Sequence, residues 1–182
     1  MNSVQRRRRA SRARFVLRLA AGLFLAVGIG LAGPAHAQIV ALGASNVAGK
    51  GVSSSEAFPA QLERMLAAKG YNAHITNAGV SGNTNADMLA RLDQAVPAGT
   101  KVVLLGTLGG RYNARRLGQG DQNAELASIM AKLRSRGIKI IPVGAAGVTR
   151  KHLQADGVHL TAEGHAVVAA RLLPSVIRAL GH

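Results

Sequence analysis

Four short apolar runs alternate with helical patterns along the chain, and this alternation constrains the fold more than any other feature. The runs span residues 38–42, 73–78, 101–105 and 138–143. The third contains four consecutive aliphatic residues, which is typical of a strand buried on both faces. Strands separated by helices connect through right-handed crossovers into a mainly parallel sheet with helices on both faces. The sequence therefore predicts a three-layer α/β fold with a sheet of four to five strands.

The helical segments have recognisable ends. One helix is predicted to open at Ser55 and stop at Gly70, and a second begins at Thr84, where an acidic residue three positions later completes a capping pattern. Thr161 caps the last helix, which Pro174 should kink. Apolar stripes are expected at positions 126, 129, 130 and 133 of the third helix and at 166, 169, 170, 173 and 177 of the last.

Residues 1–37 have the layout of a secretory signal peptide. They contain seven arginines and no acidic residue, then an apolar stretch at about residues 15–32, then the small-residue site Ala35-His36-Ala37. We expect this leader to be cleaved, which leaves residues 38–182 as one domain in the periplasm or outside the cell. A retained membrane anchor is the alternative, but the apolar stretch is near the lower length limit for a bilayer span. The arginine run lacks an adjacent pair where the twin-arginine route needs it, so the general secretory route is favoured.

Charge and composition limit the partners of the domain. Seven of the 23 Lys and Arg residues lie in the leader, which leaves 16 against 8 Asp and Glu, a net charge of +8. These charges are scattered, and the aromatic residues after the leader are only Phe58, Tyr71 and Tyr112, so nucleic-acid binding is not expected. Attraction to anionic lipid or cell-wall polymer stays open. The chain has no cysteine and no metal-ligand spacing, so neither disulfide nor metal is predicted.

Residues with catalytic chemistry follow the apolar runs, at the edge where open parallel sheets bind ligands. Gly43-Ala44-Ser45-Asn46 follows the first run, and Asp156-Gly157-Val158-His159 follows the fourth. A serine hydroxyl is a weak nucleophile at neutral pH and needs a base, which in turn needs an orienting acid. Ser45, His159 and Asp156 are the residue types for those three roles. Ordinary structural roles as a loop cap, a helix-flanking histidine and a turn former remain open for them.

The order and spacing of these segments resemble the SGNH (GDSL) hydrolase family, especially its small periplasmic thioesterase, lysophospholipase and arylesterase branch, over residues 39–178. The strand that ends in Gly-Asp-Ser matches residues 40–45, the glycine block after the second strand matches residues 77–84, and the last block matches residues 156–165. The resemblance implies a flavodoxin-like three-layer α/β/α sandwich, hydrolysis through an acyl-serine intermediate, and no cofactor.

The resemblance also implies roles for individual residues. Ser45 is the expected nucleophile, His159 the general base and Asp156 the residue that orients the imidazole. The backbone N–H groups of Ser45 and Gly82 are expected to form the oxyanion hole, together with an asparagine side chain from a Gly-x-Asn-Asp block after the third strand. Asn113 is the nearby amide that would take that place.

The sequence departs from the family pattern at two places. Ala44 replaces the acidic residue before the nucleophile. The glycine-rich segment from Gly109 to Asn113 does not reproduce the third block, because a gapless match puts Arg111 at the asparagine position and Tyr112 after it. The expected function is a secreted, monomeric serine esterase that acts on small-molecule esters or thioesters. The alternative is a non-catalytic or weakly active protein on the same scaffold that binds acyl or cell-envelope ligands.

Two further histidines, His152 and His165, have no place in this scheme. We interpret them as surface or helix-face residues. The segment Gly43-Ala44-Ser45-Asn46-Val47-Ala48-Gly49-Lys50 looks like a nucleotide-binding loop only superficially, so a nucleotide is not expected either.

Overall fold

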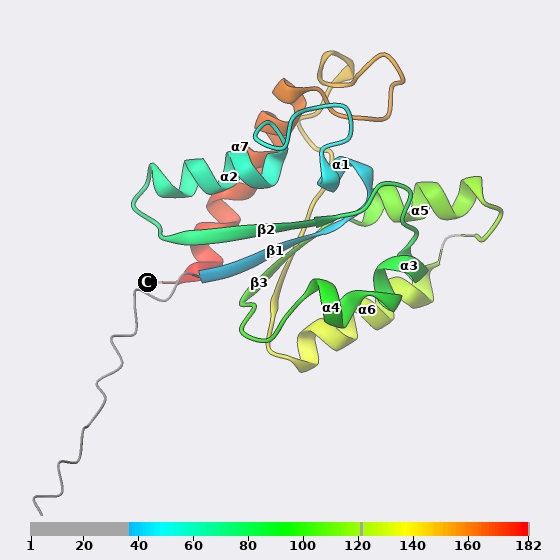
Figure 1. Cartoon of the computed structure of the whole chain (residues 1–182), viewed down its shortest axis with the longest axis horizontal. Helices are drawn as coiled ribbons and strands as arrows, with labels where there is room; N and C mark the ends of the chain where they lie inside the picture. Colours follow the sequence, from blue (N-terminus) through cyan, green and yellow to red (C-terminus); the bar gives the residue numbers. More distant parts are fainter. Residues whose placement is uncertain (1–36, 121, 182) are drawn as a thin grey trace, which may run out of the picture. The chain divides into compact units, whose positions relative to one another are not determined.

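A single parallel sheet organises the chain (Figure 1). The computed structural model describes residues 37–120 and 122–181, so the predicted leader lies outside the described residues except for Ala37. The four strands run in the order β2-β1-β3-β4, and every neighbouring pair is parallel. Their bounds are β1 Ala37–Gly43, β2 Ala73–Gly79, β3 Val102–Leu105 and β4 Lys139–Pro142. The predicted α/β class is confirmed, with four strands rather than five.

Helices cover both faces of the sheet and make two separate cores. On one face α2 (Phe58–Ala67) and α7 (Ala162–Leu180) pack against Ile39 and Ala41 of β1. On the other face Val40 and Leu42 meet the helices α3 (Asn85–Ala90), α4 (Leu92–Ala95) and α6 (Asn123–Ser135). Because successive strand residues point to opposite faces, β1 contributes to both cores and lies completely buried from Ile39 to Leu42. Figure 1 shows these helices on either side of the sheet.

The predicted helix starts are mostly confirmed. Thr84 caps α3 through a capping box with Asp87, and the Thr161 hydroxyl accepts the N–H of Gly164 at the start of α7. The first large helix begins at Phe58, later than the predicted Ser55. Among the described residues, no helix combines the length and hydropathy of a bilayer span.

The buried face of α7 is shifted by one residue from the predicted stripe. Its buried residues are Gly164, His165, Val168, Ala169, Leu172 and Val176. His165 and His152 were predicted to be surface or helix-face residues. A surface position is wrong for both, since they are 0% and 6% exposed, and His165 lies on the buried face of α7. The Nδ1 atom of His165 accepts the Phe58 N–H at 3.2 Å, and the two rings stack. Burial lowers the pKa of His165 to about 4, so the fold holds it as a neutral imidazole.

The glycine-rich segment after the third strand forms a helix rather than a loop. α5 spans Thr107–Arg116 and starts directly beyond β3, at the carboxyl end of the sheet. A β-carbon on Gly109 would lie 2.9 Å from that of Ala44, and one on Gly110 would lie 2.3 Å from the Asn85 side-chain oxygen. The two glycines weaken the helix locally but allow it to press against the segment before Ser45 and against α3.

Candidate active site

The nucleophile candidate lies where β1 ends. β1 stops at Gly43, and Ser45 is the first residue of the short helix α1 (Ser45–Ala48). The turn is tight, because a β-carbon on Gly43 would overlap Val47, and one on Gly79 at the end of β2 would overlap the backbone of α1. This packing holds Ser45 half-buried at the carboxyl edge of the sheet, between β2 and β3. Parallel sheets of this order bind ligands at that switch point.

The acid and base candidates share one loop between the 3₁₀ turn η1 (Arg150–His152) and α7. One carboxylate oxygen of Asp156 accepts the backbone N–H groups of Val158 and His159, each at 2.9 Å. Its other oxygen lies 2.5 Å from Nδ1 of His159. These contacts, led by the His159 N–H, hold the pKa of Asp156 well below its usual range. The ionised carboxylate accepts the Nδ1 proton, which leaves Nε2 of a neutral His159 as a proton acceptor.

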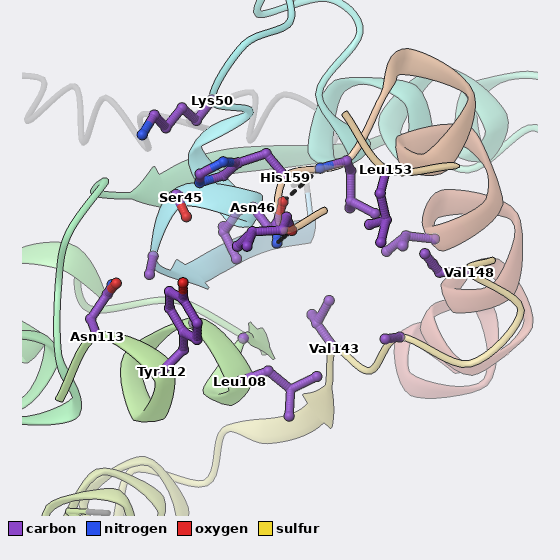
Figure 2. A pocket seen from close by; sticks show the side chains of 18 of the residues that line it. Ser45, Asn46, Lys50, Leu108, Tyr112, Asn113, Val143, Val148, Leu153 and His159 are labelled. Carbon is purple, nitrogen blue, oxygen red and sulfur yellow. Dashed lines mark hydrogen bonds between the residues drawn. The ribbon is translucent and has the colours of Figure 1, made fainter. Parts of the chain in front are cut away.

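Ser45 and His159 meet in one pocket. Both line it together with Asp156, and Figure 2 shows the His159 ring beside the Ser45 side chain. The His159 side chain is only 13% exposed, so its ring has little freedom to leave this position. No hydrogen bond links Ser45 to His159 within the described part of the chain. Catalytic hydrogen bonds often tighten only when substrate is bound, so the arrangement suits proton transfer in a complex.

The rest of the pocket is largely apolar. The whole pocket, Ser45 and His159 included, has a volume of about 710 Å³. Aliphatic side chains from α5, from the residue after β4 and from the loops around η1 line the side away from Ser45, as Figure 2 shows: Leu108, Val143, Val148 and Leu153. Two cationic residues, Lys50 and Arg116, also line it. Within the described residues no group of three or more His, Cys, Asp and Glu side chains is arranged to hold a metal ion.

The expected oxyanion residues also line the pocket. Gly82 lines the pocket with φ +87°, a conformation that favours glycine. Asn113 reaches the pocket from α5 and donates its side-chain N–H to the Asn83 carbonyl at 2.9 Å. An amide carries two N–H donors, so one remains for a ligand. Tyr112 lines the pocket as well, whereas Arg111 is not among the lining residues.

Residues 41–154 match the GDSL-like lipase/acylhydrolase family. The chain belongs to this family. The match ends two residues before Asp156, so the structure supplies the evidence for how the last block is arranged.

One named relative of this GDSL-like chain is an esterase. Esterase TesA of Pseudomonas aeruginosa is 31% identical over 106 residues, which cover 58% of this chain and 53% of TesA, so the alignment spans about half of that relative. A crystal structure of TesA superposes with a TM-score of 0.64 and 25% identity over 79% of this chain and 98% of the other. The esterase EstA from Pseudoalteromonas sp. has the same fold, with a TM-score of 0.68 and 16% identity over 80% of this chain and 100% of EstA.

An arginine that the sequence did not single out supports the loop that carries Gly82. Arg91 donates through Nε to the Asn83 side chain at 2.6 Å, and through Nη2 to the carbonyls of Gly43 and Ala78 at 3.1 and 2.9 Å. It therefore joins the ends of β1 and β2 to the loop that carries Gly82. Burial lowers its pKa. No sequence motif around Arg91 predicts this role, because its partners Gly43 and Ala78 lie on β1 and β2.

Two amide side chains were also missed. Asn46, directly after Ser45, bonds to Val158 and Leu160 in the loop that carries His159. Gln154, in that loop, bonds to Lys50 and Leu160. Asn46 stands directly after Ser45, which is the one sequence signal that singles it out.

Proposed function

We propose that this protein is a serine esterase that hydrolyses carboxylic esters or thioesters. The observation that carries the proposal is the ionised Asp156 carboxylate, hydrogen-bonded to His159 in the same pocket as Ser45. Three residues from two ends of the chain thus meet at the edge of the sheet where ligands bind. Membership of a lipase and acylhydrolase family supports the same reaction.

The reaction follows from this geometry. Nε2 of His159 takes the Ser45 proton as the Ser45 oxygen attacks the acyl carbon, and Asp156 stabilises the imidazolium. The backbone N–H groups of Ser45 and Gly82, with the second N–H of Asn113, stabilise the oxyanion. His159 then protonates the leaving oxygen or sulfur. Water, deprotonated by the same histidine, attacks the acyl-serine, releases the acid and restores Ser45.

The pocket favours an apolar acyl group. The aliphatic wall formed by Leu108, Val143, Val148 and Leu153 would remove an acyl chain from water, while Lys50 and Arg116 would favour a leaving group with negative charge. Lysophospholipids and acyl thioesters combine these two properties, and aryl esters meet the first. We place the enzyme in the periplasm or outside the cell on the strength of the leader sequence, and we expect a monomer.

One observation favours the alternative of a non-catalytic binding protein. The Asn113 amide already donates one N–H to the Asn83 carbonyl, and Arg111 occupies the position where the family carries its asparagine. A protein with a weakened oxyanion hole would still bind acyl ligands in the same pocket.

Trapping with a fluorophosphonate separates the two functions. An activated serine attacks phosphorus and displaces fluoride, so an esterase should gain one phosphonyl group per chain, located on Ser45 by peptide mass spectrometry. Ser45→Ala should gain none. A folded protein that stays unlabelled, or a label on another residue, would rule out the esterase with Ser45 as nucleophile and favour the binding protein.

A further inference from the structure

One side chain joins the nucleophile segment to the base. Nδ2 of Asn46 donates to the Val158 carbonyl at 3.0 Å, and Oδ1 of Asn46 accepts the Leu160 N–H at 3.0 Å. Val158 and Leu160 are the two neighbours of His159. The residue after Ser45 therefore holds the backbone on both sides of the histidine, although 112 and 114 residues separate it from those partners (Figure 2).

The Asp156–His159 contact cannot do this on its own. It fixes the imidazole relative to its own loop, because donor and acceptor are three residues apart. Nothing in that pair fixes the loop relative to Ser45, and the described residues show no hydrogen bond between Ser45 and His159. The distance across which the proton moves must therefore be set by contacts between the two segments. Asn46 makes such contacts at the positions nearest to both reacting side chains.

We propose that Asn46 is a positioning residue that sets the place of the His159 ring relative to the Ser45 hydroxyl. The inference rests on the proposed function, because it assigns a role within that reaction. The amide nitrogen and the amide oxygen of Asn46 both bond to the loop, so the proposed role is exerted through His159.

A second side-chain amide, that of Gln154, also links the segment after Ser45 to the loop that carries His159, farther from the reacting side chains. Nε2 of Gln154 donates to the carbonyls of Lys50 and Leu160 at 2.8 and 2.7 Å. The Gln154 backbone N–H also donates to the His159 carbonyl at 2.7 Å. These bonds keep the loop attached when Asn46 is replaced, so variants at Asn46 should fold with a displaced base rather than with a detached loop.

The test compares Asn46→Ala and Asn46→Leu with the parent. Leucine keeps the branched four-atom outline of asparagine but is bulkier and has no polar atom, whereas alanine removes most of the side chain. A loss of rate that both variants share therefore reports the lost hydrogen bonds rather than a change of volume. Asn77→Ala is the matched control, because Asn77 is exposed and accepts only the N–H of Gly79, two residues away. Each full-length protein is reacted with a p-nitrophenyl organophosphate, and both the amount and the rate of p-nitrophenol release are measured.

A positioning role predicts that both Asn46 variants release one equivalent per chain, but about ten- to a hundredfold more slowly per site. In turnover of a p-nitrophenyl ester, kcat should fall by a similar factor while KM changes less than about twofold. Asn77→Ala should match the parent in all these measurements.

Three results would overturn the inference. Asn46→Leu reacting at the parent's rate would show that the hydrogen bonds are not needed. Fewer labelled sites that each react at the parent's rate would show a role in folding only. A parent that does not react at Ser45 would overturn the esterase itself and this inference with it, whereas the first two results leave the esterase standing.

Discussion

The two walls of the pocket are built by different means. On the wall formed by α1 and the loop before α7, polar groups converge: Asp156 orients His159, and Asn46 holds the backbone on both sides of that histidine. The wall formed by α5 is closely packed at its glycines and is lined mostly by aliphatic and aromatic side chains. Its one lining amide, Asn113, donates an N–H to the Asn83 carbonyl. In the proposed reaction, proton transfer would depend on hydrogen bonds, whereas the shape of the α5 wall depends on close packing. A change in the glycine-rich segment would therefore alter the α5 wall and leave the hydrogen bonds around His159 in place.

The largest effect should come from the first wall. Ser45→Ala removes the nucleophile and should lower turnover of p-nitrophenyl butyrate by at least about a thousandfold. The midpoint of thermal unfolding should hardly change, because the hydroxyl has no structural hydrogen bond among the described residues. Turnover by this variant would show that another residue is the nucleophile, and the wall with Ser45 and His159 would then not be the one that carries the reaction.

The next effect tests the base and its pH dependence. His159→Ala should lose nearly as much activity as Ser45→Ala, and Asp156→Asn should lose less. The lowered pKa keeps Asp156 ionised throughout the working range, so the fall in kcat/KM toward acid pH reports protonation of the histidine. A pH–rate profile that is flat between about pH 5 and 8 would exclude His159 as the base.

Acid unfolding must be separated from that profile. His165 is buried and neutral with a pKa of about 4, below the 6.5 of an ordinary histidine. As pH falls, this histidine binds its proton in the unfolded chain before it does so in the folded one. The free energy of unfolding is therefore highest above about pH 6.5 and declines by up to about 3 kcal/mol as pH falls to about 4. Urea unfolding across the same pH range measures this loss. His165→Phe should flatten it without moving the midpoint of the activity profile.

A smaller effect concerns the second wall. If the free N–H of Asn113 meets the oxyanion, Asn113→Ala should lower kcat by roughly a hundredfold and leave KM nearly unchanged. Arg111→Ala, on the same helix but not lining the pocket, is the matched control and should behave like the parent. Equal kcat values for the two variants would leave the oxyanion to the backbone donors of Ser45 and Gly82.

The smallest effect concerns substrate charge. Arg116 lines the pocket and lies over the Tyr112 ring at 5.9 Å, whereas Arg111 does not line it. Arg116→Gln should raise KM for esters with an anionic leaving group about two- to fivefold and spare neutral esters, because exposed charge pairs contribute little. A KM that rises equally for both kinds of ester would point to lost packing on Tyr112 instead.

The sequence predicts this fold well where the signal is local. Apolar runs locate all four strands, and Thr84 and Thr161 mark two helix starts, because strand burial and capping depend on neighbouring residues. The sequence does not predict α5, because two glycines disfavour a helix there. The helix forms because it packs against Ala44 and α3. The α7 stripe was misplaced because small and aliphatic residues occupy so many of its positions that two phases fit almost equally well.

The candidate site shows the same division. Ser45, Asp156 and His159 can be identified because each stands in a short motif, and the structure brings them to one pocket. Arg91 and Asn46 cannot be found in this way. Their partners lie on other elements, and only the folded chain shows which carbonyl or N–H each side chain meets.

The packing of Gly109 on Ala44 restricts which residues the two positions can hold. Ala44 is 2% exposed, and even one added carbon on Gly109 would press against it. An aspartate at position 44 would bury a carboxylate beneath α5 unless the helix moved away. Position 44 and the helix that carries Tyr112 and Asn113 therefore form one steric unit, so a larger residue at position 44 would require a rearrangement of α5.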